Sequence, residues 1–305
     1  MTWTTNDIPD LSGRLAIITG ATGGLGLETA LVLAGKGAEV ALAARNPDKG
    51  AEAERLIRSR HPNAAVRFEL LDLASLASVQ AFAERHLATG RPIDILIDNA
   101  GVMALPTRQT TVDGFEMQFG TNYLSHFALV GRLLPLLIGA KARVVQLSSV
   151  AHRSGHLRLG DLNYQTHYSP WPVYQQSKLA MLMFALELQR RSDANGWSLT
   201  SVAAHPGFAR TDLIANGHAG KPGLFARGAR LLEAVLSHSA ADGALPILMA
   251  ATLPDPTPGG YYGPTGFQEM KGPPGVAVIK RHASDADVAR RLWTESERLT
   301  GVTYG

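Results

Sequence analysis

The chain has 305 residues, of which 45% are hydrophobic, and its formal net charge at pH 7 is +3. This length and apolar content suffice for a sizeable core, so we expect a globular protein. The chain has no cysteine, which excludes disulfides, thiolate metal sites and cysteine nucleophiles and fits a reducing compartment. The Lys and Arg residues are scattered rather than massed in one tract, so we expect no nucleic-acid partner.

The first residues, 1 to 14, show no charged segment followed by an apolar one, as a secretory leader would. We also identify no stretch that approaches the ~20 apolar residues needed to span a bilayer. The sequence therefore predicts a soluble, cytoplasmic protein without a membrane anchor.

Apolar runs of strand length alternate with stretches of helical period along the chain. The expected strands are Leu15 to Thr19, Val40 to Ala44, Val66 to Leu71, Ile93 to Ile97, Val144 to Leu147 and Leu199 to Ala204. A first helix should end at Gly35 and Gly37, and further helices are expected near 48–60, 75–89, 113–138, 173–192, 240–252 and 283–300. The pattern predicts a single α/β domain over 1–305, a Rossmann-like doubly wound parallel sheet with helices on both faces, whose ligands bind beyond the carboxyl ends of the strands.

A glycine-rich turn, Thr19 to Gly26, joins the first strand to the first helix. Glycines let backbone approach a pyrophosphate, and the free N–H groups and dipole at a helix start favour its charge. The residues expected to bind a dinucleotide here are Gly20, Thr22, Gly23, Gly24, Leu25 and Gly26. The spacing fits both a T-G-x-x-x-G-x-G turn and the T-G-x-x-G-x-x-G turn of sugar-nucleotide epimerases. Such a turn can also simply connect a strand to a helix without binding a ligand.

Polar or small residues also follow the next three strands. Arg45 places a cation where an NAD-specific site would place a carboxylate, so we expect it to face the 2′-phosphate of NADP(H). Asp72, followed by Leu73, is placed to accept a hydrogen bond from an adenine amino group. The run Asn99-Ala100-Gly101 would let backbone approach the cofactor ribose, although Asn99 could instead satisfy a local turn, and Arg45 could be an ordinary solvent arginine.

The expected chemistry centres on Tyr174 and Lys178, which an i, i+4 spacing places on one helix face. A phenol has a pKa near 10, so work as an acid or base near neutral pH requires an adjacent cation, which Lys178 together with an oxidised nicotinamide would supply. Ser148 and Ser149 close the fifth strand, where a hydroxyl can hold a substrate oxygen or simply cap a turn. Asn122 is a poor interior helix residue, and a kink there could anchor a water linked to Lys178.

In this order the motifs resemble those of the short-chain dehydrogenase/reductase family, single-domain type, over residues 12 to 265 or so. The run Ser148 to His152, the 25-residue step from Ser149 to Tyr174, and Asp161-Leu162-Asn163 resemble the retinol-dehydrogenase and protochlorophyllide-reductase-like branch. Epimerase-type relatives lack this set. Three departures stand out: Asp98 where Asn is usual, Ser125 where Gly often follows the catalytic Asn, and the absence of the membrane anchor of many retinol enzymes.

The resemblance implies a catalytic tetrad of Asn122, Ser149, Tyr174 and Lys178, in which Ser149 and Tyr174 bind the carbonyl oxygen. It further implies that Lys178 grips the nicotinamide ribose together with Tyr174, that Arg45 selects NADP, and that Pro206 and Thr211 belong to the element that holds the carboxamide. The implied activity is hydride transfer between NADP(H) and a carbonyl or alcohol carbon. A non-catalytic NADP(H)-binding sensor or scaffold is the alternative.

Apolar residues interleaved with glycines suggest a substrate lid near 207–240 and hence a bulky, apolar small-molecule substrate, although the same residues could simply pack the core. The helices expected near 113–138 and 173–192 resemble those through which family members associate, which implies a homodimer or homotetramer. We expect no metal site, because His152 and His156 have no carboxylate ligand nearby and Gly155 lies between them.

Overall fold

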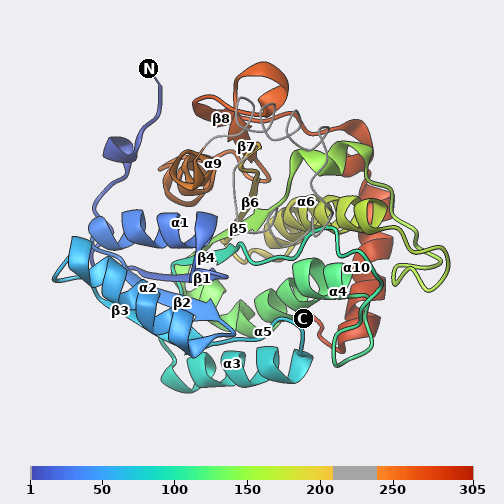
Figure 1. Ribbon diagram of the computed structural model, residues 1–305, viewed down its shortest axis with the longest axis horizontal. Coiled ribbons are helices and arrows are strands. Elements are labelled where there is room, and N and C mark those ends of the chain that lie inside the picture. The colour runs from blue at the N-terminus through green and yellow to red at the C-terminus, as the bar shows by residue number, and fades with distance from the viewer. Residues whose placement is uncertain (1, 209–238, 305) are drawn as a thin grey trace, which may run out of the picture.

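A central sheet runs through the part of the chain that the computed structural model describes, residues 2–208 and 239–304 (Figure 1). The strand order is β3-β2-β1-β4-β5-β6-β7-β8, and every neighbouring pair is parallel except β7 and β8. The bounds are β1 Leu15–Thr19, β2 Glu39–Ala44, β3 Val66–Leu70, β4 Ile95–Asp98, β5 Arg143–Leu147, β6 Thr200–Ala204, β7 Tyr261–Pro264 and β8 Pro274–Val276. The doubly wound parallel sheet expected from the sequence is confirmed.

The first six strands agree with the sequence prediction to within two residues at either end. Strands β7 and β8 were not predicted. Both are short and contain glycine and proline, which are rare in strand interiors, so no propensity signal identifies them. They form only because β6 and β7 offer them an edge to pair with.

Strand side chains alternate between two cores, one on each face of the sheet. In β1, Leu15 and Ile17 belong to one apolar cluster, whereas Ala16 and Ile18 belong to the other. All four are at most 1% exposed. Burial on both faces is why the strands read as continuous apolar runs rather than as alternating ones.

Helices cover both faces of the sheet, and Figure 1 shows α1 and α9 on one side and α3 and α5 on the other. The first layer contains α1 (Gly24–Gly35), α2 (Pro47–Arg60) and α9 (Ala240–Thr252). The second contains α3 (Leu76–Thr89), α5 (Ser125–Ala140) and α6 (Pro170–Asn195), with α10 (Ala286–Thr300) packed against α6. Short helical turns are η1 (Thr5–Asp7), α4 (Met117–Phe119), η3 (Val150–Ser154), η4 (Phe267–Glu269) and η5 (Arg281–Ser284).

The helix expected near 113–138 differs from the prediction, because the α-helical α4 and α5 are joined by a π-helical turn, η2 (Gly120–Leu124). The combined stretch Met117–Ala140 has the length and hydropathy of a membrane span, contrary to the expectation that no segment does. Of its most apolar window, 67% is buried inside the protein. The apolar residues of this helix therefore belong to the core.

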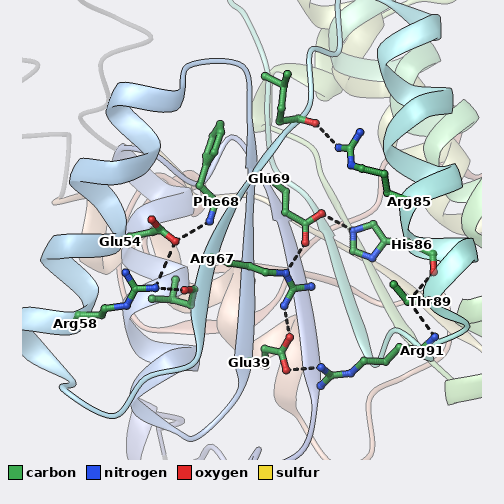
Figure 2. Close-up of polar contacts among 12 residues, drawn as sticks. Glu39, Glu54, Arg58, Arg67, Phe68, Glu69, Arg85, His86, Thr89 and Arg91 are labelled. Carbon is green, nitrogen blue, oxygen red and sulfur yellow. Dashed lines mark hydrogen bonds and ion pairs between the residues drawn. The ribbon is translucent and has the colours of Figure 1, made fainter.

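A network of charged side chains ties β2, β3 and α3 together at the β3 edge of the sheet (Figure 2). Glu39, the first residue of β2, pairs with both Arg67 and Arg91. Arg67 also donates to Glu69 at 2.6 Å, and Glu69 contacts the buried His86 ring at 2.8 Å. Arg67 thus fastens the edge strand β3 to its neighbours.

Candidate active site

The residues expected to bind ligands lie after β1, β2, β3, β4, β5 and β6, which are all parallel. The carboxyl ends of parallel strands meet at one edge of a sheet, so residues that are up to 186 positions apart, Gly20 and Pro206, come to the same edge. The proposed lid near 207–240 and Thr211 lie outside the described residues, apart from the ends of that range.

The turn between β1 and α1 has the close backbone packing that a pyrophosphate site needs. Gly20 has a positive φ of 68°, and a Cβ added at Gly26 would lie 2.6 Å from both the Gly20 carbonyl oxygen and the Asn99 side chain. No side chain caps the N-terminus of α1, which starts after the N-cap Gly23, so its first N–H groups are not occupied by a side-chain acceptor. Glycines and helix start together fit the phosphates of a dinucleotide.

Asn99 fastens the end of β4 to the end of β1. Its side-chain Nδ2 donates to the Thr19 carbonyl at 2.8 Å, and its backbone N–H donates to Thr19 Oγ1 at 2.9 Å. The Asn99 side chain therefore joins two strands 80 positions apart instead of satisfying a local turn, and it lies beside the glycine turn. A Cβ at Gly20 would lie 3.0 Å from the Ala100 Cα, which shows how closely the two segments pack.

Arg45 is exposed just beyond β2 and makes no ion pair or hydrogen bond with any residue in 2–208 or 239–304. Its guanidinium is thus available to an anion. Asp72 is half-buried, and its Oδ1 accepts the Ala74 backbone N–H at 3.0 Å, so this oxygen shapes the turn after β3. Leu73 is buried in the core, which leaves only its backbone to contact a ligand.

Asn122 lies at the centre of the π-helical turn and is fully buried. Its side chain accepts from the Val102 N–H at 2.7 Å and donates to the Val102 carbonyl at 3.0 Å and to Ser177 Oγ at 2.9 Å. The helix is irregular at this residue, because a π-helical turn replaces the regular α-helical pairing here. Its amide joins the segment after β4 to α6 one residue before Lys178.

Tyr174 and Lys178 lie one turn apart on α6, both buried, with the Lys178 Nζ 5.9 Å from the centre of the Tyr174 ring. Lys178 donates to the Leu147 carbonyl at 2.9 Å. Burial lowers the pKa of Lys178 to about 8. Burial also raises the pKa of Tyr174 to about 12, and its hydrogen bond with Ser149 offsets this only in part.

The expected lowering of the phenol pKa was assigned to Lys178 together with an oxidised nicotinamide, and the protein residues by themselves raise this pKa. At this distance the cost of burying a phenolate exceeds any stabilisation by the cation. The protein residues alone therefore hold Tyr174 in its protonated form, which suits a proton donor.

Ser149 and Ser148 have separate roles at the end of β5. Ser149 lies next to Tyr174 and also accepts the Ala151 N–H at 3.2 Å, so it caps η3 as well. Ser148 is buried and donates to the Lys178 carbonyl at 2.8 Å. Only Ser149 is therefore placed to share a substrate oxygen with Tyr174.

The turn His205-Pro206-Gly207 after β6 is held by the loop between β7 and β8. The Phe208 N–H donates to the Met270 carbonyl at 2.7 Å, and the His205 Nε2 contacts Glu269 at 3.0 Å. Glu269 also pairs with Arg153 at 2.6 Å. Hydrogen bonding to His205 and the charge of Arg153 outweigh burial, so the pKa of Glu269 falls to about 2.

The sequence analysis missed three residues that support this site: Ser177, His126 and Glu269. Ser177 and His126 could have been found from spacing, since one precedes Lys178 and the other lies four residues after Asn122. Glu269 carries no such signal, because it belongs to a loop between two strands that were not predicted.

The family model for short chain dehydrogenases matches residues 14–221 of the chain, which is more than half of its length. The chain belongs to the short-chain dehydrogenase/reductase family. It is an oxidoreductase of that family, and the predicted resemblance is confirmed.

Curated relatives place it in the family's retinol-dehydrogenase branch. It is 41% identical to human retinol dehydrogenase 13 over 299 residues, which cover 96% of this chain and 86% of the relative. It is 40% identical to polyprenol dehydrogenase from Mus musculus over 304 residues, which cover 98% of this chain and 87% of the relative.

Solved structures of the family share the fold. A crystal structure of an uncharacterized protein from Mycobacterium paratuberculosis superimposes with a TM-score of 0.82 at 39% identity, covering 100% of both chains. A short chain dehydrogenase from Shigella flexneri 2a, complexed with NADP, has a TM-score of 0.62 at 24% identity, covering 80% of this chain and 92% of that one. The second likeness concerns the fold alone.

Proposed function

We propose that this protein is an NADP(H)-dependent oxidoreductase that interconverts a carbonyl group and an alcohol on a bulky, apolar substrate. The observation that carries the proposal is the meeting of Ser149, Tyr174 and Lys178 at the carboxyl edge of the sheet, where burial favours the protonated form of Tyr174 and Ser149 lies beside it. Polar groups this deeply buried cost stability, and such sites are typical of catalysis.

In the direction of reduction, the hydroxyls of Ser149 and Tyr174 hold the carbonyl oxygen, and Tyr174 delivers the proton to it. Lys178 supplies positive charge beside Tyr174. A Cβ added at Gly101 would lie 3.6 Å from the Lys178 Nζ, so this lysine also reaches the segment that would bind the ribose. Asn122 keeps Lys178 in place through Ser177. The nicotinamide, when bound, supplies or accepts the hydride.

Four groups would select and hold the cofactor. The turn from Gly20 to Gly26 and the start of α1 would take the pyrophosphate, Asn99 to Gly101 the ribose, and Pro206 with Thr211 the carboxamide. Arg45 would take the 2′-phosphate, since it is exposed and unpaired among the described residues.

Two observations support an apolar substrate. The Trp171 ring, 48% exposed, lies 5.4 Å from the Tyr174 ring and offers an aromatic surface beside the reacting groups. The two relatives named above act on retinol and polyprenol, which are both apolar alcohols.

The test is the loss of NADPH absorbance with a panel of ketones, aldehydes and quinones, with NADH in parallel and Tyr174→Phe as the control. We expect turnover with NADPH that falls at least about a thousandfold in Tyr174→Phe, because the proton donor is gone. Arg45→Ala should weaken NADPH binding about tenfold or more and leave NADH binding unchanged. Tight NADPH binding without turnover across the panel would instead favour a cofactor sensor.

A cytoplasmic location and a homodimer or homotetramer are also proposed. Cell fractionation and light scattering test them, and a monomer by light scattering would contradict the second.

A further inference from the structure

His126, in the first turn of α5, is fully buried and uses both of its ring nitrogens. Its Nδ1 lies 2.8 Å from the Asn122 carbonyl oxygen, and its Nε2 lies 2.9 Å from Thr19 Oγ1. The ring thus bridges the π-helical turn that carries Asn122 and the end of β1, where the glycine turn begins. No described residue other than His126 joins these two points with one side chain.

The partners of His126 determine its protonation. A carbonyl oxygen can only accept, so Nδ1 carries the hydrogen. Burial, reinforced by the charge of Lys178, lowers the pKa of His126 to about 4, so the ring is neutral near pH 7 and its Nε2 is an acceptor.

The Thr19 hydroxyl then has a fixed orientation. It donates to His126 Nε2 at 2.9 Å rather than to the Ile97 carbonyl, which is farther away at 3.4 Å. The lone pairs of Thr19 Oγ1 accept the backbone N–H groups of Asn99 and Ala100, both at 2.9 Å. The hydrogen bonds run in one direction, from Asn99 and Ala100 through Thr19 and His126 to Asn122.

The two ends of this series of hydrogen bonds lie in different parts of the site. Asn99, Ala100 and Thr19 lie beside the glycine turn, on the side proposed for the cofactor. Asn122 lies on the catalytic side, where its amide reaches Ser177 beside Lys178. A π-helical turn also departs from regular helical pairing, so its carbonyls gain from a side-chain donor.

We propose that His126 is a positioning residue, a neutral imidazole that holds the Asn122 turn in register with the cofactor-binding ends of β1 and β4. The inference rests on the proposed function and adds a residue to it. The proposal predicts two separable effects of His126, one through the hydrogen bond from Nδ1 to Asn122 and one through the hydrogen bond that Nε2 accepts from Thr19.

Two substitutions separate these effects. Asn places an amide nitrogen as many bonds from the backbone as Nδ1, so His126→Asn keeps the donor to Asn122 and loses the acceptor for Thr19. Gln places its amide at the distance of Nε2, so His126→Gln keeps a partner for Thr19 and loses the donor to Asn122. We expect His126→Asn to raise the NADPH Kd about tenfold with a smaller change in kcat. We expect His126→Gln to lower kcat about tenfold, equal to about 1.4 kcal/mol, with an NADPH Kd within about twofold of wild type.

Matched controls distinguish positioning from general destabilisation. His86 is also a buried histidine, bonded to Glu69 at the far edge of the sheet (Figure 2). His86→Asn and His86→Gln should lower the melting temperature and leave kcat and NADPH Kd unchanged. Thr19→Val removes the hydroxyl at the other end of the bridge. Its effect on NADPH Kd should be at least as large as that of His126→Asn, because the hydroxyl also holds the Asn99 and Ala100 N–H groups. Adding His126→Asn to Thr19→Val should cause no further loss.

NADPH binding is measured by fluorescence titration, which needs no substrate. The kcat is measured separately at saturating NADPH. An unchanged NADPH Kd in both His126→Asn and Thr19→Val would overturn the proposal, whether or not a substrate is known. Equal losses of kcat and affinity in the two His126 variants would also overturn it. Failure of the proposed function has a different signature, which is turnover that persists in Tyr174→Phe.

Discussion

The sharpest test of the cofactor turn is a pair of glycine-to-alanine substitutions with opposite expected signs. Both Gly26 in α1 and Gly139 in α5 are helical, so alanine gains about 0.5–1 kcal/mol of intrinsic helix stability at either position. The surroundings differ. At Gly26 the added Cβ would lie 2.6 Å from the Gly20 carbonyl oxygen, whereas at Gly139 the nearest atom, on Pro92, is 4.0 Å away.

At Gly26 the conflicting atoms include backbone, the Gly20 carbonyl and the Ala21 Cα at 3.0 Å, which cannot rotate away. The turn itself must shift, and overpacking of this kind costs about 1–3 kcal/mol. After subtracting the helix gain, we expect Gly26→Ala to lose up to about 2.5 kcal/mol and Gly139→Ala to gain about 0.5–1 kcal/mol. At about 2 °C per kcal/mol for a domain of this size, the two melting temperatures should move in opposite directions.

The assays are thermal unfolding by circular dichroism and NADPH binding by fluorescence titration. Because the shifted turn is the proposed pyrophosphate site, Gly26→Ala should also weaken NADPH binding by about tenfold or more, while Gly139→Ala binds as wild type does. A Gly26→Ala protein that is as stable as Gly139→Ala and binds NADPH normally would refute the packing argument.

Two further predictions follow from buried charge. Burial holds the pKa of Lys178 at about 8 in the folded protein against 10.5 unfolded, so between these pH values only the unfolded chain keeps the proton and stability rises with pH. Lys178→Met should therefore abolish turnover yet stabilise the cofactor-free protein at pH 7 by up to about 3 kcal/mol. In thermal melts this gain in stability over wild type should shrink between pH 8 and 10.5. A variant that is less stable than wild type at pH 7 would contradict the prediction. The pKa of Glu269 is depressed to about 2 from 4.5, so its contribution is present above pH 4.5 and is lost as the pH falls toward 2. Glu269→Gln should lower the melting temperature at pH 7 by a few degrees. The difference in melting temperature from wild type should narrow below pH 4.5, and a difference that stays constant would contradict this prediction.

Much of the site could be predicted from the sequence because its residues follow strands that are recognisable on their own. Asn122 shows this well, since an amide inside an apolar helix conflicts with local propensity, and the structure has a π-helical turn at this position. Strands β7 and β8 show the opposite, because their glycine and proline give no strand signal and only the pairing of β7 with β6 and of β8 with β7 defines them.

The sequence alone determined the parallel sheet, the glycine turn after β1 and the spacing of Tyr174 and Lys178, because periodicity and motif order are local properties of the chain. Only the tertiary structure decided the protonation preferences and the links between segments. The pKa of Tyr174 depends on how deeply it is buried, and the bridge through His126 joins residues 107 positions apart. Burial and long-range contacts arise when the elements pack together, so no pattern along the chain encodes them in a form that can be read directly.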